Sequence, residues 1–468
     1  MKNKKPKKIL STFNLVMITI LSVDSLRNLP STAIFGSSVI FFFIVAAIVF
    51  LIPSALVSTE LAVAYPQSGG VYVWVKEAFG PKFGFFAIWL QWIESVIWFP
   101  TILSFMAGII GYLINPELAS SKTFLISVVL VSFWGATLVN LIGMHFSALL
   151  STICAIFGLL LPMLLIIGLG VLWVFLKRPM QIDFSLHSVL PNFSEPGVWV
   201  ALTGVMLSFC GMEVSAAHAG EVIDPKRAFP RALTISIFII LFTLIMGALS
   251  IAMVVPRSHI SLVAGMIQAF DMFFRAYHMH WVLPIVAVTL VIGSLGGLSN
   301  WIIAPIKGLM ASASDDCLPT HCLKENKYGA PWVLLFYQAL IVTLLTLVFL
   351  LMPSVNGSYW VLTVLTAQLY MLMYVFMFAA GIYLKYKNKV TASKDFRIPF
   401  GKIGMYTVAT IGLIGVIFTF VIGLIPPDNI EVGSTLHYEV ILITGLILMI
   451  SPPFVLQAMR NKKLKAKA

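Results

Sequence analysis

Two oppositely charged residues lie inside the first apolar stretch of the chain, where a membrane helix would normally carry none. Asp24 and Arg27 are accompanied there by Ser22, Ser25 and Leu26. We predict that the helix unwinds near Ser22 to Ser25, since non-helical backbone at membrane depth is tolerated only where it is buried in protein or lines a wet cavity. The N–H groups of Ser25, Leu26 and Arg27 would then be available to bind a carboxylate at the start of the second half-helix.

Two interpretations of this charged pair remain open. In the first, Asp24 binds a substrate ammonium group or carries a coupled proton, and Arg27 binds a substrate carboxylate. In the second, Arg27 forms an internal salt bridge with Asp24, three residues earlier, which neutralises both. A charge at the membrane centre costs about 3 kcal/mol or more, which favours pairing. Both interpretations hold if the substrate displaces the pair.

A second apolar stretch is interrupted by Phe209, Cys210 and Gly211, with Glu213 directly after them. Glycine and a carboxylate at membrane depth predict another broken helix and a candidate functional site. The carbonyl groups of Phe209, Cys210 and Gly211 would be available to bind an ammonium group. Glu213 either borders the binding site and takes up a proton, or caps the second half-helix by accepting its N–H groups.

Other candidates for the same site come in pairs that are one helical turn apart. Glu94 and Trp98 share a helix face, as do Tyr370 and Tyr374. Glu94 either faces the cavity or bonds to a neighbouring span, and the tyrosine hydroxyls are candidate hydrogen-bond donors to a substrate. We expect Trp98 to contribute to a gate.

Three more residues are candidates for gating or for the wall of the cavity. Trp301 follows a run of small residues and forms either a gate or part of the packed core. Glu60 and Glu221 lie near the predicted cytoplasmic ends of their spans, where we expect them to form ion pairs at an inner gate.

The composition shows what kind of protein carries these residues. Hydrophobic residues make up 60% of the 468 positions and charged residues only 10%, a balance that soluble domains do not have. We predict an all-α polytopic membrane protein with twelve spans of about 20 apolar residues or more. The predicted spans are 11–38, 40–65, 83–114, 122–143, 147–176, 197–222, 232–255, 281–311, 332–352, 359–384, 404–425 and 438–458.

The net charge of +12 is explained by topology and not by nucleic-acid binding. Most of the 30 lysines and arginines fall in the two termini and in the loops that would share a side with them. The positive-inside rule therefore predicts a multi-pass protein of the bacterial cytoplasmic (inner) membrane, in contact with the lipid bilayer and with both termini in the cytoplasm.

The two interrupted spans are the first and the sixth, which occupy corresponding positions in two five-span halves. Such a pair of interruptions points to an inverted-repeat transporter with a binding site at the membrane midplane. We predict one transmembrane transporter domain, with repeats at about 11–176 and 197–384 and two extra helices at about 404–458.

Other functional classes have little support in the sequence. There is no phosphate-binding loop, nucleophile elbow or paired set of metal ligands, so we expect no enzyme activity, no cofactor and no metal site. A channel would present rings of like groups instead of asymmetric polar groups. A membrane sensor that binds an amino acid without transporting it remains an alternative.

Several segments match the motifs of one transporter branch. They are 52–62, 69–75, 211–216, 221–225, 249–256, 299–303 and 426–430. On these segments the chain resembles the amino acid–polyamine–organocation superfamily, and within it the bacterial glutamate/γ-aminobutyrate antiporters. The resemblance implies a LeuT-type fold of five plus five inverted spans with two extra helices, and exchange of amino acids by alternating access. It also implies a central cavity lined by Glu213, Trp301, Tyr370 and Tyr374.

The chain departs from that family at three places. Residues 22–27 replace the usual glycine-rich break, Gly297 stands where the glutamate exchanger has an acidic residue, and the chain stops at Ala468 without the exchanger's long C-terminal plug. We therefore expect a secondary amino acid transporter, an antiporter of glutamate/γ-aminobutyrate-like or related substrates, with proton coupling left open. The alternative is a proton symporter for a neutral amino acid.

Overall fold

The computed structural model describes residues 10–65, 69–142, 154, 156–194, 196–216, 222–315, 317–388 and 396–465 of the chain. Within these residues the regular structure is helical. Ten helical segments are long and apolar enough to cross a membrane. They are Gly36–Ala64, Pro81–Ile114, Lys122–Leu141, Ile156–Phe175, Arg227–Val254, His280–Met310, Trp332–Leu351, Val355–Tyr386, Gly401–Ile422 and Thr435–Ala458.

The named helices within and between these segments are as follows. The first half of the chain contains α3 (Val39–Ala46), α4 (Ile52–Ala64), α5 (Val71–Phe79), α6 (Pro81–Ile114), α7 (Lys122–Leu141), α9 (Leu161–Phe175) and α10 (Leu186–Val189). The second half contains α14 (Pro225–Val254), α15 (Gly265–Ala276), α16 (Leu283–Ala311), α17 (Trp332–Thr346), α18 (Val348–Leu351), α19 (Val355–Tyr386), α20 (Gly401–Ile422), α21 (Thr435–Ile450) and α22 (Pro452–Lys465).

The first apolar stretch is broken where the sequence predicts. Helix α1 (Thr12–Val23) ends at Asp24, and both Asp24 and Ser25 have extended backbone. A short 3₁₀ turn (Leu26–Asn28) and α2 (Leu29–Ala33) then continue the span. Pro30 lies in the first turn of α2, where its missing N–H group costs no hydrogen bond.

The second break lies at Phe209–Gly211, between α12 (Ala201–Ser208) and α13 (Met212–Ala216). Gly211 has φ +111°, and a Cβ atom there would come within 2.6 Å of the Ser22 carbonyl oxygen. Glycine is therefore required both for the backbone conformation and for close contact between the two breaks. The second break thus packs directly on the end of α1.

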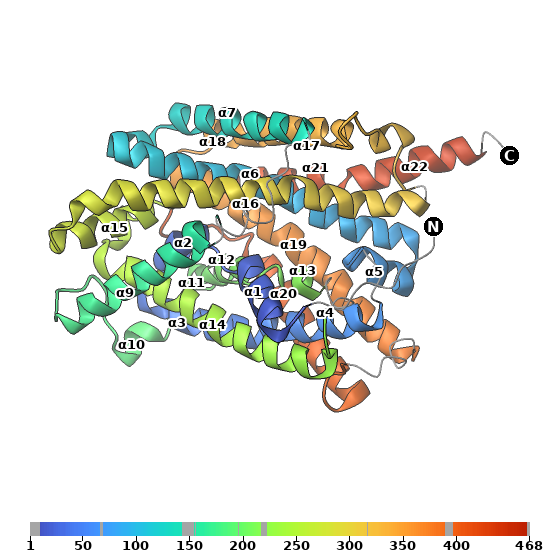
Figure 1. Cartoon of the computed structure of the whole chain (residues 1–468), viewed down its shortest axis with the longest axis horizontal. Coiled ribbons are helices and arrows are strands. Elements are labelled where there is room, and N and C mark those ends of the chain that lie inside the picture. The colour runs from blue at the N-terminus through green and yellow to red at the C-terminus, as the bar shows by residue number, and fades with distance from the viewer. Residues whose placement is uncertain are drawn as a thin grey trace.

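Other helices hold the two broken segments at the centre of the bundle (Figure 1). Helix α1 packs along α14 and against α13, and α16 packs along α6. Gly158 and Gly293 allow the segment before α9 to lie against α16, since a Cβ atom on Gly158 would overlap Gly293 at 2.1 Å. Small residues at such crossings let membrane helices approach closely.

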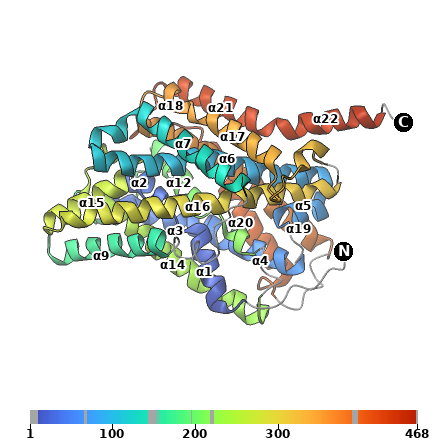
Figure 2. The ribbon, with the colours of Figure 1, turned by 45° about the horizontal axis from the view of Figure 1, so that its top comes forward.

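The two ends of the bundle carry different short elements. Helices α5 and α22 lie at one end and α15 lies at the other in both views (Figures 1 and 2), and α10 lies at the α15 end in Figure 1. Helix α5 begins after Gly69 and Gly70 and ends at Gly80, all three with positive φ. The segment after the second apolar stretch is therefore a short helix between two glycine turns.

Candidate functional site

A cavity of about 350 Å³ lies where the two breaks meet. Its wall combines residues of the first break, residues of the second break and side chains from α6, α16 and α19. The predicted site residues in this wall are Ser22, Asp24, Ser25, Leu26, Arg27, Glu94, Trp98, Cys210, Gly211, Trp301 and Tyr370. Gly297 lines the cavity too, so the position that departs from the antiporter pattern faces this space.

The backbone of the first break faces this cavity with unused donors. The N–H groups of Ser25, Leu26 and Arg27 form no hydrogen bond with any of the described residues. Free N–H groups at the start of a helical turn are suited to binding a carboxylate. On the second break, Cys210 and Gly211 line the cavity, and the Gly211 carbonyl group accepts a hydrogen bond from the Val214 N–H.

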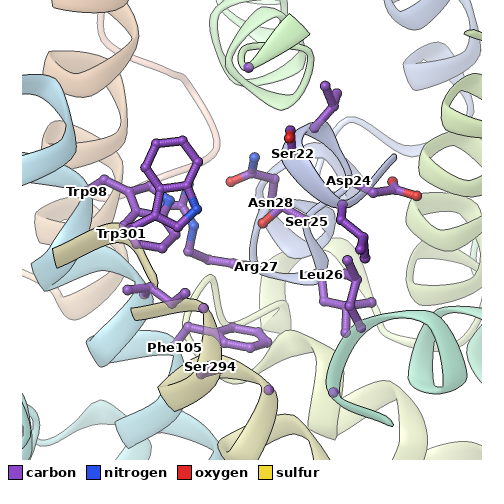
Figure 3. Close-up of a pocket in the computed structure, with 18 of the residues that line it drawn as sticks. Ser22, Asp24, Ser25, Leu26, Arg27, Asn28, Trp98, Phe105, Ser294 and Trp301 are labelled. Carbon is purple, nitrogen blue, oxygen red and sulfur yellow. The ribbon is translucent and has the colours of Figure 1, made fainter. Parts of the chain in front are cut away.

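Arg27 is the most unusual residue in this wall. Its side chain is buried, donates a hydrogen bond from Nη1 to the Thr101 hydroxyl, and lies 5.6 Å from the centre of the Trp98 ring. Its Nε has no hydrogen-bond partner among the described residues, nor does Oδ1 of Asn28 beside it. The close-up shows both side chains directed toward Trp98 and Trp301 (Figure 3). The guanidinium group is thus held in place, and its Nε–H group is left to donate a hydrogen bond.

Asp24 does not pair with Arg27. Its carboxylate is 2.9 Å and 3.2 Å from the Thr243 hydroxyl of α14, and its side chain points to the opposite side of the break (Figure 3). The internal salt bridge, the second of the two interpretations, is therefore absent from the structure. The extended backbone at Asp24 and Ser25 removes the helical spacing that would bring residues three apart together.

Glu94 and Trp98 line the cavity together, as the one-turn spacing predicts. Glu94 is buried and accepts a hydrogen bond from the Ser95 hydroxyl of its own helix at 2.8 Å. Trp98 packs against Trp301 with ring centres 6.1 Å apart, so two indoles from α6 and α16 close one side of the cavity. Glu94 therefore faces the cavity, and its one side-chain bond within the described residues is to its own helix.

Glu213 lies behind the cavity wall. Its carboxylate accepts hydrogen bonds from Tyr370 at 2.6 Å, from Gln91 at 3.1 Å and from the Tyr374 hydroxyl. Tyr374 also accepts the Gly211 N–H at 3.2 Å. Of the four residues that the family resemblance placed in the cavity wall, Trp301 and Tyr370 lie there, whereas Glu213 and Tyr374 do not.

The prediction for Phe209 concerned its backbone carbonyl group, and the structure places its side chain away from the cavity. Its side chain is fully buried and packs against Phe43, with ring centres 5.5 Å apart. It is absent from the cavity wall because this large apolar side chain packs into the bundle behind the break. Phe209 and the carboxylate–tyrosine cluster therefore support the second break from behind.

Ion pairs occur at the end of the bundle that carries α5. Glu60 forms a buried ion pair with Lys385 of α19 and accepts the Ile398 N–H at 2.7 Å. The expected ion pair of Glu60 is therefore present, whereas Glu221 lies outside the described residues.

Helix α5 is tied to the segment that follows α16 at the same end. Lys76 pairs with Asp315 at 2.5 Å, and the Tyr72 hydroxyl donates to the same carboxylate. Burial and the neighbouring Asp315 charge raise the pKa of Tyr72, so the phenol stays a hydrogen-bond donor at neutral pH.

Sequence reasoning missed the polar partners of the charged residues. Thr101 holds the Arg27 side chain, the Tyr359 hydroxyl donates to the Arg27 carbonyl at 3.0 Å, and Thr243 holds Asp24. Isolated threonines in apolar spans carry little signal because each can instead bond to its own helix, and an isolated tyrosine can serve as an ordinary packed aromatic side chain. Asn28, next to Arg27, was the one missed residue with a readable signal, since it is an amide at membrane depth.

Comparison with known proteins identifies the chain's relatives. A family model described as "Amino acid permease" matches residues 10–447. An uncharacterised transporter of Legionella pneumophila is 44% identical over 98% of both chains. A glutamate/gamma-aminobutyrate antiporter of Lactococcus lactis is 28% identical over 98% of this chain and 92% of its own length. A probable agmatine/putrescine antiporter of the same species is 22% identical over 81% of this chain and 80% of its own.

The match to the family model covers nearly all of the described helices, including both breaks and the cavity wall between them. The long apolar helices are those of an integral membrane protein, and the relatives are transporters, not enzymes. The chain belongs to the amino acid permease family of the amino acid–polyamine–organocation superfamily.

Proposed function

We propose that this chain is a secondary active transporter that exchanges amino acids across the bacterial cytoplasmic membrane by alternating access. In this proposal it has twelve spans in a LeuT-type arrangement, with inverted repeats at about 11–176 and 197–384, two extra helices at about 404–458, and both termini in the cytoplasm. Support comes from the two broken helices in corresponding halves and from the antiporters among its relatives.

The observation that carries the proposal is the buried guanidinium group of Arg27 in the central cavity. It has no carboxylate within ion-pair distance among the described residues, and its Nε atom is unpaired. A buried charge is normally retained with a partner or for a function. A substrate carboxylate, bound by Arg27 and by the free N–H groups of residues 25–27, supplies the missing partner.

The amine of the substrate needs an acceptor on another side of the same cavity. Glu94 offers a carboxylate with one intramolecular hydrogen bond, and Asn28 offers an unpaired carbonyl oxygen. A cavity of about 350 Å³ is at the small end of ligand pockets and fits one amino acid. We propose glutamate, γ-aminobutyrate or a related amino acid with a free carboxylate as the substrate.

The proposed gates lie on two sides of this cavity. Trp98 and Trp301 line one side of the cavity. Their two indole rings, which are in contact, can move apart to admit a substrate or close over it. Glu60 with Lys385, and α5 with Asp315, hold the elements at the α5 end together and must separate if that end opens. Proton movement accompanies the exchange in this proposal.

Counterflow tests the function directly. Proteoliposomes loaded with one unlabelled amino acid at a time are assayed for uptake of labelled glutamate, γ-aminobutyrate, glutamine and putrescine. We expect uptake of at least one carboxylated substrate and much weaker uptake of putrescine, which has no carboxylate. If no amino acid exchanges over a broad pH range, the proposed function is wrong.

A further inference from the structure

The Thr243 hydroxyl next to Asp24 has more acceptors around it than it can serve. Its oxygen is 2.9 Å from Asp24 Oδ2, 2.9 Å from the Ile239 carbonyl oxygen and 3.1 Å from the Ile240 carbonyl oxygen. A hydroxyl group donates one proton and accepts through its lone pairs. The hydrogen bonds can therefore be completed in two ways, which differ in whether the Asp24 carboxyl group carries a proton.

When Asp24 is charged, Thr243 donates to it, and the carboxylate receives one hydrogen bond. When Asp24 is protonated, its own O–H donates to Thr243, and the Thr243 proton turns to the Ile239 carbonyl group four residues earlier. The only change between the two states is one added proton, and the hydroxyl rotates to accommodate it. In the neutral state one carboxyl oxygen is satisfied through its own O–H group and only the uncharged carbonyl oxygen lacks a donor, whereas the charged state has a single donor for two buried oxygens that share a negative charge.

Among the described residues, no cationic side chain faces Asp24 to compensate its charge. Helix α14 carries no titratable side chain between Arg231 and Val254, and α1, α2, α3 and α9 carry none at all. Arg27 points to the other side of the break (Figure 3).

The remaining titratable groups around the cavity do not supply a cation either. Glu94 on α6 is acidic, and Cys154, Cys210 and Tyr370 in the wall are neutral when protonated. On α13, Glu213 is also acidic, and it is engaged by its tyrosines. A buried carboxylate without a cation costs several kcal/mol in its charged form.

We propose that Asp24 is a proton-binding site whose occupancy is coupled to the transport cycle. This inference rests on the proposed function and adds to it the residue that links transport to protons. The charged carboxylate needs the water of an open cavity, whereas the protonated carboxyl group can be sealed between α1 and α14. Asp24 therefore releases its proton when the cavity is open to water on one side and must bind one before the break closes against α14.

Infrared difference spectroscopy on the purified protein tests the site without requiring transport. The carbonyl stretch of a protonated carboxyl group is followed as a function of pH in the wild type, Asp24→Asn, Glu94→Gln and Glu213→Gln. We expect one band that titrates in the wild type, is absent in Asp24→Asn and persists in the other two variants. A band that survives in Asp24→Asn and disappears in Glu94→Gln or Glu213→Gln would overturn the assignment.

Thr243 offers a second test that keeps the carboxyl group. Thr243→Val removes its hydroxyl partner and is expected to move the midpoint of the same band, while Thr243→Ser, which retains a hydroxyl, brings it back toward the wild-type midpoint. An unchanged midpoint in Thr243→Val would contradict the two-state hydrogen-bond arrangement even if Asp24→Asn fails to fold.

Net flux in proteoliposomes tests the coupling. If one proton moves per substrate, each unit of imposed pH difference changes the steady-state substrate ratio about tenfold. We expect the wild type to follow the pH gradient and Asp24→Asn to lose this response in whatever exchange it retains. A wild type that exchanges substrate but ignores the gradient overturns the inference alone, whereas a titrating Asp24 band without any exchange overturns the proposed function alone.

Discussion

Replacing Arg27 with glutamine separates a substrate-binding role from a structural one. In the empty cavity the guanidinium group gains a charge-assisted hydrogen bond to Thr101, of about 1.5–3 kcal/mol, and a cation–π contact with Trp98, of about 0.5–2 kcal/mol. Against these stands a desolvation cost of several kcal/mol for a buried ion without a counter-charge. Because these contributions largely cancel, Arg27→Gln should change the stability of the substrate-free protein by less than about 2 kcal/mol.

The effect on binding should be much larger. Removing one partner of a buried, hydrogen-bonded charge pair costs about 2–5 kcal/mol, which corresponds to roughly 30-fold to a few thousand-fold weaker binding of a carboxylated substrate. The assay is equilibrium binding of the labelled substrate to purified protein, with thermal unfolding measured on the same samples. Arg231→Gln, the same chemical change at an exposed position of α14, is the matched control and should alter neither.

Two results would refute this reasoning. Unchanged affinity for carboxylated substrates in Arg27→Gln would show that the guanidinium group does not bind them. Strong rescue of the stability of Arg27→Gln by Asp24→Asn would show that the two charges interact, whereas the structure places them on opposite sides of the break. We expect their effects on stability to add within about 0.5 kcal/mol, as for residues that share no contact.

Three further predictions concern the breaks and the gates. Gly211→Ala should abolish folding or transport, measured by size-exclusion chromatography and counterflow, because its Cβ atom would lie 2.6 Å from the Ser22 carbonyl oxygen in a backbone of positive φ; normal transport would contradict the contact between the breaks. Lys385→Met should lower stability by about 3–5 kcal/mol by leaving Glu60 charged and buried, and the double variant with Glu60→Gln should recover most of that loss in thermal unfolding; equal stability of the two variants would contradict it. Trp301→Ala should reduce counterflow more than Trp301→Phe, which keeps an aromatic ring against Trp98; equal losses would argue against a role for the ring itself.

The positions of the two breaks could be predicted from the sequence because they depend on local chemistry. Serine and charged residues in the first stretch, and Gly211 in the second, are unfavourable in an unbroken apolar helix. The structure has extended backbone at Asp24 and Ser25 and a positive φ at Gly211.

The partners of the charged residues could not be predicted in the same way. Helical spacing favoured a bond between Asp24 and Arg27, but that spacing applies only while the backbone is helical. Once the helix opens, each side chain bonds to the neighbouring span that it faces, Thr243 of α14 for Asp24 and Thr101 of α6 for Arg27. Those neighbours are set by the packing of helices more than 70 residues apart, which one sequence does not reveal.

The completeness of hydrogen bonding distinguishes two kinds of buried charge in this protein. Glu213 has donors from Tyr370, Tyr374 and Gln91, so its carboxylate is fully engaged without a ligand and serves to fix the second break. Arg27 has a hydroxyl and an aromatic face but no counter-charge among the described residues, and one of its buried nitrogens is unpaired. An unpaired buried charge is costly unless a ligand supplies its partner. The incomplete group lies in the cavity wall and the complete one lies behind it, which is the arrangement expected if the substrate, and not the protein, supplies the missing partner.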